Sequence, residues 1–450
     1  MYFLCVLYAC FVLLAVPEIW AADSLTSPLP SKEAIDLQKA IEVALHQSPV
    51  LKSAQADEEV AQAAFEGAKA ALWPKIDLNA SYFKENQPIP YIPAQAIDIP
   101  AKFSDEIYAW SIFLRLPIYE GGRLVGQVQV SRIERSSQAF LRQMTLNDLV
   151  ANVTNTFYKC LQLKQLISAY ELSVSAMKQQ RKDMEVRFKL GRIAQVELLR
   201  MDVQLAAEER RLVAAQEGLK RSRNALAFFM GINSYELPDL RGEINANEGI
   251  LQVDITTLVQ SRPDVVAIKH RVQAERERLN VVKAKRYPSI SLVSDYGNRA
   301  GAGLSNREEV WEAGVTASLN IFDGGVISSE LAKQQAAVAK AEETLRLLEL
   351  RAQKEIEDAI SALNEAKERL KLAETSVLQA KEALRIEELR YKTGSTNITD
   401  FLLSQSAMSL AEADRLQALY DYNAALTEFK RATGAISGNS LVSLATSFRE

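Results

Sequence analysis

Few side chains in this chain could do chemistry. Its two histidines, His46 and His270, each lie on a predicted helix without metal-ligand spacing, and we find neither a glycine-rich phosphate loop nor a nucleophile motif. Cys160 lies in a predicted heptad seam, where a small buried apolar residue is a simpler interpretation than a reactive thiol. We therefore expect no enzyme activity, no metal site and no cofactor.

Two acidic residues have positions that matter electrostatically. Glu197 comes six residues after Gly191, and Asp400 comes six residues after Gly394. Each glycine suits a chain reversal with positive φ, so each acid falls in the first turn of the next helix. There a carboxylate stabilises the helix dipole, and Asn397 with Asp400 resembles a capping box. If three copies of the chain met at these turns, the acids would also form an anionic ring that favours cations.

These turns end two very long helical stretches. From Val326 to Thr393 the chain has neither glycine nor proline, and from Arg123 to Leu190 it has only Gly126. At about 1.5 Å per residue, each stretch would span roughly 100 Å as one helix. A second periodic segment of roughly 35 residues follows each turn. The chain is therefore expected to hold two long helical hairpins, at about 122–230 and 325–433.

Both long helices carry a heptad seam that predicts packing against another helix. In the second helix large apolar side chains recur every seven residues, and the position four residues before them is alanine. The large side chains are those of Ile356, Leu363, Leu370, Val377, Leu384 and Tyr391. The first helix repeats this frame, with an interruption at Arg181, through Val153, Cys160, Ile167, Val174 and Phe188.

The whole pattern occurs twice. Residues 116–122 before the first long helix match 319–325 before the second, and upstream 48–49 match 262–263. The first pair of matching segments is separated by fewer residues than the second pair. The residues that account for this difference fall in a proline-rich loop of the first copy, at roughly 85–107. We divide the chain into a signal peptide at 1–21, a first repeat at 22–237, a second repeat at 238–436 and a C-terminal tail at 437–450.

Four short segments alternate with period two, at about 75–84, 108–118, 288–297 and 310–321, so each presents one apolar and one polar face. The pattern fits a soluble sheet packed on helices or the tilted strands of a membrane barrel. Aromatic residues near the loop ends favour the barrel, as an interfacial girdle. They are Tyr82, Tyr108, Trp110, Tyr296 and Trp311.

Stoichiometry follows from the membrane interpretation. A lipid-exposed sheet must leave no edge unpaired, and single-chain barrels begin at about eight strands. Four strands cannot close, so the chain must oligomerise. Three copies would give a twelve-strand barrel and, below it, a second barrel of twelve helices.

This duplicated order of helix, strand pair and long hairpin resembles the TolC-like outer-membrane efflux protein family, the outer membrane factors, over roughly residues 33 to 436. The resemblance rests on the hairpin turns and on three segments: 116–123 (LPIYEGGR), 321–325 (IFDGG) and 262–264 (RPD). It implies a mainly α fold with a transmembrane β-barrel, assembled as a homotrimer in the outer membrane of a Gram-negative bacterium, with a large periplasmic part.

The resemblance also implies partners. It predicts contact with outer-membrane lipid, docking to a periplasmic adaptor (membrane fusion protein), and an inner-membrane pump of the RND or ABC type. Such a protein is the exit duct of a tripartite efflux pump or a type I secretion system. The net charge of −4 suggests no nucleic-acid partner.

Family members carry their functional residues at the hairpin turns. The resemblance implies that Asp400 and Glu197 lie at a constricted entrance, and that Tyr391 helps to hold it closed by bonding an acid such as Glu197. The turns themselves are candidates for adaptor docking. The docking candidates are Gly191, Gly394, Arg187 and Arg390.

Two positions depart from the family pattern. The gate arginine expected two residues after the glycine is Thr396, and a second acid found in some members is Leu403. Arg192, one residue after the other glycine, is the candidate substitute for the arginine.

The alternative is a periplasmic coiled-coil scaffold or adaptor without a membrane barrel. It explains the hairpins, but it does not explain the duplicated strands or the aromatic residues near their loop ends. A detergent requirement for extraction would distinguish the two.

Overall fold

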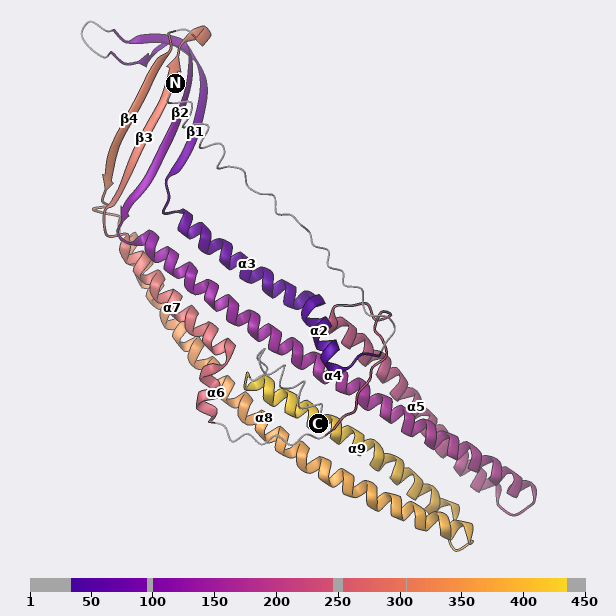
Figure 1. The fold of residues 1–450 in the computed structure, drawn as a ribbon. Coiled ribbons are helices and arrows are strands. Elements are labelled where there is room, and N and C mark those ends of the chain that lie inside the picture. The colour runs from indigo at the N-terminus through magenta and orange to yellow at the C-terminus, as the bar shows by residue number, and fades with distance from the viewer. Residues whose placement is uncertain (1–33, 95–99, 246–253, 305, 435–450) are drawn as a thin grey trace.

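The chain forms an elongated molecule with a sheet at one end and two helical turns at the other (Figure 1). The computed structural model describes residues 34–94, 100–245, 254–304 and 306–434. The expected signal peptide and C-terminal tail lie outside these residues. Within the described parts, every helix is too short or too polar to cross a membrane.

The elements repeat in order. The first half contains α2 (Leu37–Gln47), α3 (Pro49–Ala70), β1 (Lys75–Ile92), β2 (Lys102–Glu120), α4 (Arg123–Lys189) and α5 (Gln195–Met230). The second half contains α6 (Ile255–Ser261), α7 (Pro263–Ala284), β3 (Ser289–Ala300), the 3-10 turn η1 (Ala302–Leu304), β4 (Glu308–Ser318), α8 (Val326–Lys392) and α9 (Ile398–Ala432). Both α4 and α8 are unbroken helices of 67 residues.

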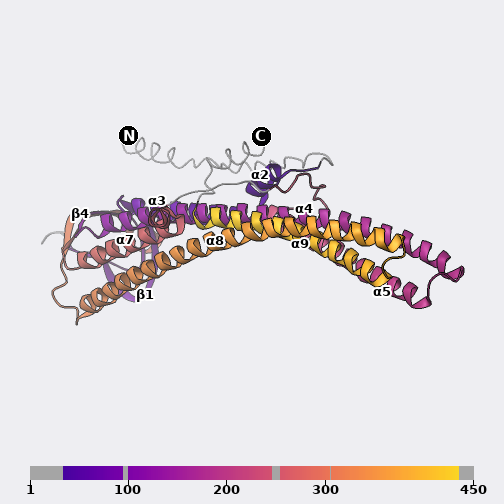
Figure 2. The ribbon, with the colours of Figure 1, turned by 90° about the horizontal axis from the view of Figure 1, so that it is seen from below.

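The helices lie side by side in a thin, curved layer (Figure 2). Near the sheet α4 packs on α3 and α7, and further along it packs on α5 and α9. In the same way α8 packs first on α7 and then on α9. The layer is therefore four helices wide along its whole length. Near the sheet the four helices are α3, α4, α7 and α8; near the turns α5 takes the place of α3, and α9 that of α7.

The seam of α8 packs where the sequence predicts. Ile356 and Leu370 are buried, and the remaining large seam residues are half-buried. In α4 the prediction is wrong near the turn, because Phe188 is 38% exposed. There the seam runs instead through Met177 and Met184, which are buried seven residues apart.

The four strands form one antiparallel sheet in the order β1-β2-β3-β4. The register sets Tyr82 opposite Tyr108, Ile112 opposite Tyr296, and Tyr296 opposite Trp311. The apolar sides predicted for separate strands therefore join into one face of the sheet. Neighbouring aromatic rings on this face are close, with 4.8 Å between the centroids of Tyr82 and Tyr108.

The proline-rich segment is not the loop that the sequence suggests. β1 continues to Ile92 and β2 already begins at Lys102. Pro88 and Pro90 are tolerated because β1 is an edge strand of the sheet and its pairing with β2 shifts register on either side of Ile89 and Pro90. At the other edge β4 ends at Ser318, so Ile321, the last residue of the predicted strand, lies outside the observed one and is exposed.

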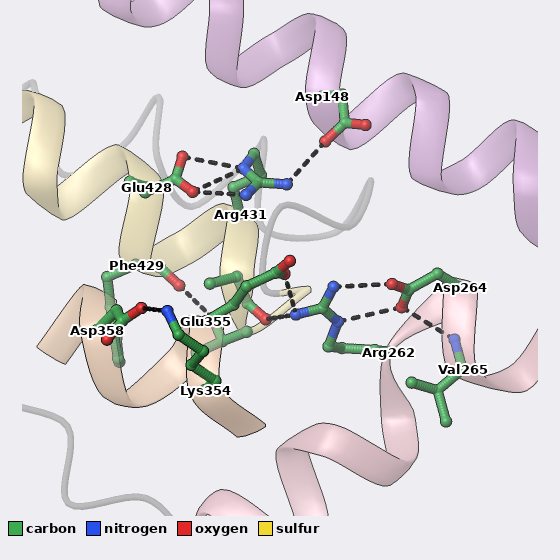
Figure 3. A network of polar contacts seen from close by, with 12 residues as sticks. Asp148, Arg262, Asp264, Val265, Lys354, Glu355, Asp358, Glu428, Phe429 and Arg431 are labelled. Atoms are coloured by element: carbon green, nitrogen blue, oxygen red, sulfur yellow. Dashed lines mark hydrogen bonds and ion pairs between the residues drawn. The ribbon is translucent and has the colours of Figure 1, made fainter. Parts of the chain in front are cut away.

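The second repeat has a buried polar junction where α6 meets α7 (Figure 3). The guanidinium of Arg262 donates to both carboxylate oxygens of Asp264, at 3.0 and 2.7 Å. It also donates to Glu355 of α8 at 2.9 Å and to the carbonyl oxygen of Ala432 at 3.3 Å. One side chain therefore joins α7, α8 and the end of α9.

Candidate functional site at the hairpin turns

The two helical turns lie at the same end of the molecule (Figure 1). Gly191 and Gly394 adopt left-handed backbone angles, with φ of 69° and 75°. The residue after each glycine donates its amide to the carbonyl of Arg187 or Arg390, at 2.8 Å in both turns. This bond pattern ends a helix at a left-handed residue, so each glycine is required by backbone conformation.

An apolar cluster holds the two turns together; we call it the turn-end core. It joins residues of α4, α5 and α9, with Ile193 and Tyr391 packed against it. Its buried members are Val174, Met177, Met184, Met201, Leu205, Ile398, Phe401 and Leu402. The two hairpins are therefore in contact within one chain at the position where the family entrance is expected.

Tyr391 lies at the edge of the turn-end core. Its ring stacks on Phe401 with 5.4 Å between centroids and 18° between planes. Burial raises the pKa of Tyr391; the charge of Arg187 opposes this shift, and that of Glu197 adds to it. The hydroxyl is buried, and its nearest polar neighbour is the Arg187 side chain, which acts on its pKa as a weak hydrogen-bond donor. The expected bond to Glu197 is therefore not formed within one chain, although these three side chains lie close together.

Asp400 is exposed at the tip of the second hairpin. Its amide donates to the side-chain oxygen of Asn397 at 3.0 Å, as the predicted helix cap requires. Its carboxylate accepts from the hydroxyl of Thr396 at 3.0 Å, so the residue in the gate-arginine position orients this acid. Glu197 is half-buried in the first turn of α5.

At the turn end, Arg200 reaches from the first hairpin to the second. Its guanidinium donates to the hydroxyl of Thr399 on α9 at 2.5 Å. Arg192, the substitute that sequence reasoning suggested, is exposed in the turn itself. Arg200 belongs to no recognisable motif, so sequence reasoning missed it. A second polar link lies further along, where buried Glu208 accepts from Ser409 at 2.6 Å.

The remaining candidates are surface residues. Arg187 and Arg390 are exposed beside their turns, and Arg390 pairs with Glu387 at 2.7 Å. Leu403, in place of the second family acid, is also exposed.

Cys160 is buried, and burial raises its pKa to about 12. The part of the chain that the structure describes contains no cluster of three or more metal-binding side chains.

Comparison with known proteins identifies the family. The family model described as "Outer membrane efflux protein" matches residues 40–232 and 255–435. OprJ of Pseudomonas aeruginosa is 24% identical over 441 residues, which cover 90% of this chain and 86% of that protein. TolC of Escherichia coli is 20% identical over 427 residues, or 92% of this chain and 85% of that protein.

Solved structures show the same fold. The CmeC outer membrane channel of Campylobacter jejuni matches with a TM-score of 0.79 at 18% identity, covering 91% of this chain and 88% of that chain. Because the family model matches well over half of the sequence, the chain belongs to the outer membrane efflux protein family.

Proposed function

We propose that three copies of this outer-membrane protein form a continuous duct. The three sheets would close into a twelve-strand barrel in the outer membrane, and the helices into a twelve-helix periplasmic tunnel. The duct would serve as the exit of a tripartite efflux pump or a type I secretion system. It would dock to a periplasmic adaptor and an RND or ABC pump of the inner membrane.

The sheet carries this proposal. Its apolar face includes exposed residues that none of the described helices covers: Ile76, Leu78, Trp110, Trp311 and Val315. A soluble sheet would bury such a face, whereas a lipid-facing sheet exposes it. Within the described residues, β1 and β4 are each paired on one side only, so their free edges require neighbouring strands in lipid.

The helical layer supports the same stoichiometry. Since each half of the layer is four helices wide, three copies supply twelve helices along the whole tunnel. The 67 residues of α4 or α8 reach roughly 100 Å at about 1.5 Å per residue. A scaffold or adaptor would share such hairpins, but it would give no role to the exposed apolar sheet.

At the turn end, three copies of Asp400 and Glu197 would surround the entrance with negative charge. An exposed carboxylate ring attracts cations and can hold multivalent ones. The hydroxyl of Tyr391 would then bond an acid of the neighbouring hairpins when the entrance is closed. The exposed turns, with Arg187 and Arg390, would contact the adaptor.

The test is conductance in a planar bilayer. The wild-type protein should form cation-preferring channels that multivalent cations block from the turn-end side. Changing Asp400→Ala together with Glu197→Ala should weaken this block by tenfold or more, whereas Glu66→Ala on distant α3 should leave it unchanged. Unaltered block and selectivity in the double variant would exclude the anionic ring, and a protein without channel activity would exclude the duct.

A further inference from the structure

The first β-hairpin extends beyond the second. β1 and β2 contain 18 and 19 residues, whereas β3 and β4 contain 12 and 11. The extra length does not continue straight, because the pairing of β1 with β2 is shifted between Lys84 and Ile89 and again between Pro90 and Ile92. Extra residues in one strand bend it. Figure 1 shows the end of this hairpin turning across the outer end of the sheet.

We call residues 85–92 of β1 and 102–106 of β2 the outer flap. Within it Tyr91 and Ile92 are buried, although most of β1 is exposed. The flap owes this burial to its packing on the β3–β4 turn. The hydroxyl of Tyr91 donates to the carbonyl oxygen of Asn306 at 3.2 Å.

Two further contacts fasten the flap, and a glycine leaves room for it. Lys102 forms an ion pair with Glu308 at the start of β4. The amide of Ala302 donates to the hydroxyl of Ser104 at 3.0 Å. A Cβ atom added to Gly301 would lie 3.2 Å from the Cβ of Ser104 and 3.4 Å from the ring of Tyr91. The absent side chain of this glycine therefore permits the close approach of the flap.

The flap is folded over the polar face of the sheet. Asn79, Ser111, Asp295 and Arg299 line a hollow on this face, opposite the aromatic face. From the hollow the guanidinium of Arg299 reaches the carbonyl oxygen of Tyr91 at 3.4 Å. The bend therefore leads away from the apolar face and over the polar one.

We infer that the outer flap is a lid on the exit of the duct. The inference rests on the proposed function, in which the polar face lines the barrel lumen. Three flaps folded over this face narrow the outer opening, and the contacts of Tyr91, Arg299 and Lys102 hold them down. Each contact is a hydrogen bond or a partly exposed ion pair, and such contacts are individually weak. Departing cargo can therefore displace the flap without disturbing the paired strands below it.

The test measures access to the hollow from outside. Ser111→Cys places a thiol in the hollow of the polar face, which Arg299 shares and links to the flap, in the full-length protein. Intact cells are then treated with a bulky or a small membrane-impermeant maleimide. The unaltered protein serves as the blank, because buried Cys160 is its only cysteine outside residues 1–21. The small reagent should label Ser111→Cys readily and the bulky one slowly.

Breaking the ion pair between Lys102 and Glu308 should admit the bulky reagent to the hollow. Adding Lys102→Glu should speed its reaction at least tenfold, and adding Glu308→Lys as well should restore slow labelling by reversing the ion pair. Tyr91→Phe, which removes only the hydroxyl, should give a smaller increase. Equal amounts of extracted protein show that the variants fold.

The outcomes are separable. The lid would be overturned if the bulky reagent labelled Ser111→Cys quickly without any further change. It would also be overturned if labelling stayed slow after Lys102→Glu was added. Either result would leave the duct intact. Failure of even the small reagent to label would overturn the assignment of the polar face to the lumen, and the lid with it.

Discussion

The long helices of the two repeats, α4 and α8, have equal length, yet the chain buries them differently. In α4 buried residues extend from Val130 to Met184, because α3, α5, α7 and α9 all pack against it. In α8 they extend only from Leu331 to Leu370, because α8 packs mainly on α7 and α9. Local sequence therefore sets the length of each helix, whereas its position in the layer sets its burial.

The same contrast holds at the turns. The first hairpin contributes residues of both helices to the turn-end core, whereas the buried residues from the second hairpin all come from α9. Beyond Leu370, α8 exposes apolar residues such as Leu372, Leu378 and Leu389. This is the surface that neighbouring copies would cover in the proposed trimer.

The largest effect is expected from a charge in the α8 seam. Leu370 is 6% exposed, so Leu370→Asp would bury a carboxylate without a partner and should prevent assembly of normal trimers. The matched control is Lys371→Asp, which introduces the same side chain at the adjacent, exposed position. Trimer yield after detergent extraction measures both. Normal trimers from Leu370→Asp would show that the seam is assigned wrongly.

A smaller loss is expected from the junction that only the second repeat possesses. Ser48 and Val50 occupy the places of Arg262 and Asp264 in the first repeat. Because Arg262→Ala leaves Asp264 without its partner, it should destabilise the fold by about 3–5 kcal/mol.

Thermal unfolding in detergent measures this loss. The control is Arg276→Ala, which breaks an exposed ion pair with Glu342 and should cost about 0–1 kcal/mol. Equal shifts in the two variants would mean that the junction contributes no more than a surface pair.

Removing the link between the hairpins should have a modest effect. Arg200→Ala loses the hydrogen bond to Thr399, which contributes about 1 kcal/mol, so the turn end should open more often. Single-channel recordings should show open probability rising several-fold, whereas Arg192→Ala in the turn should change it little. The opposite ranking would restore Arg192 as the substitute for the gate arginine.

The smallest effect concerns Cys160. Its pKa is raised to about 12 because burial disfavours the thiolate, so at pH 8 a thiol reagent should react only after unfolding. The linked stability is constant at neutral pH and falls above about pH 9, where the unfolded chain loses this proton first. Rapid reaction of the folded protein at pH 8 would contradict the burial of this part of α4.

Local patterns predicted much of this molecule. The uninterrupted stretches became α4 and α8, the glycines became left-handed turns, and Asn397 caps α9 as expected. These features depend on neighbours in sequence. The extension of β1 through Pro88 was missed because a proline on an edge strand costs no ladder bond, and the sequence does not show which strand is at the edge.

Contacts between hairpins were harder to predict. Arg200 meets Thr399 from a helix that begins about 200 residues earlier, and neither lies in a motif. In α4 the seam near the turn passes to Met177 and Met184, because Arg181 pairs with Asp202 instead of entering the core. These choices depend on which helix lies alongside, which periodicity alone does not specify.

The account depends most directly on closure of the sheet by three copies. The decisive measurement is the native mass of the protein extracted by detergent from a purified outer-membrane fraction. We predict a trimer that requires detergent for release, because four strands with two free edges cannot persist alone in lipid. A monomer or dimer, or release by salt or alkali without detergent, would contradict the barrel and favour the periplasmic scaffold.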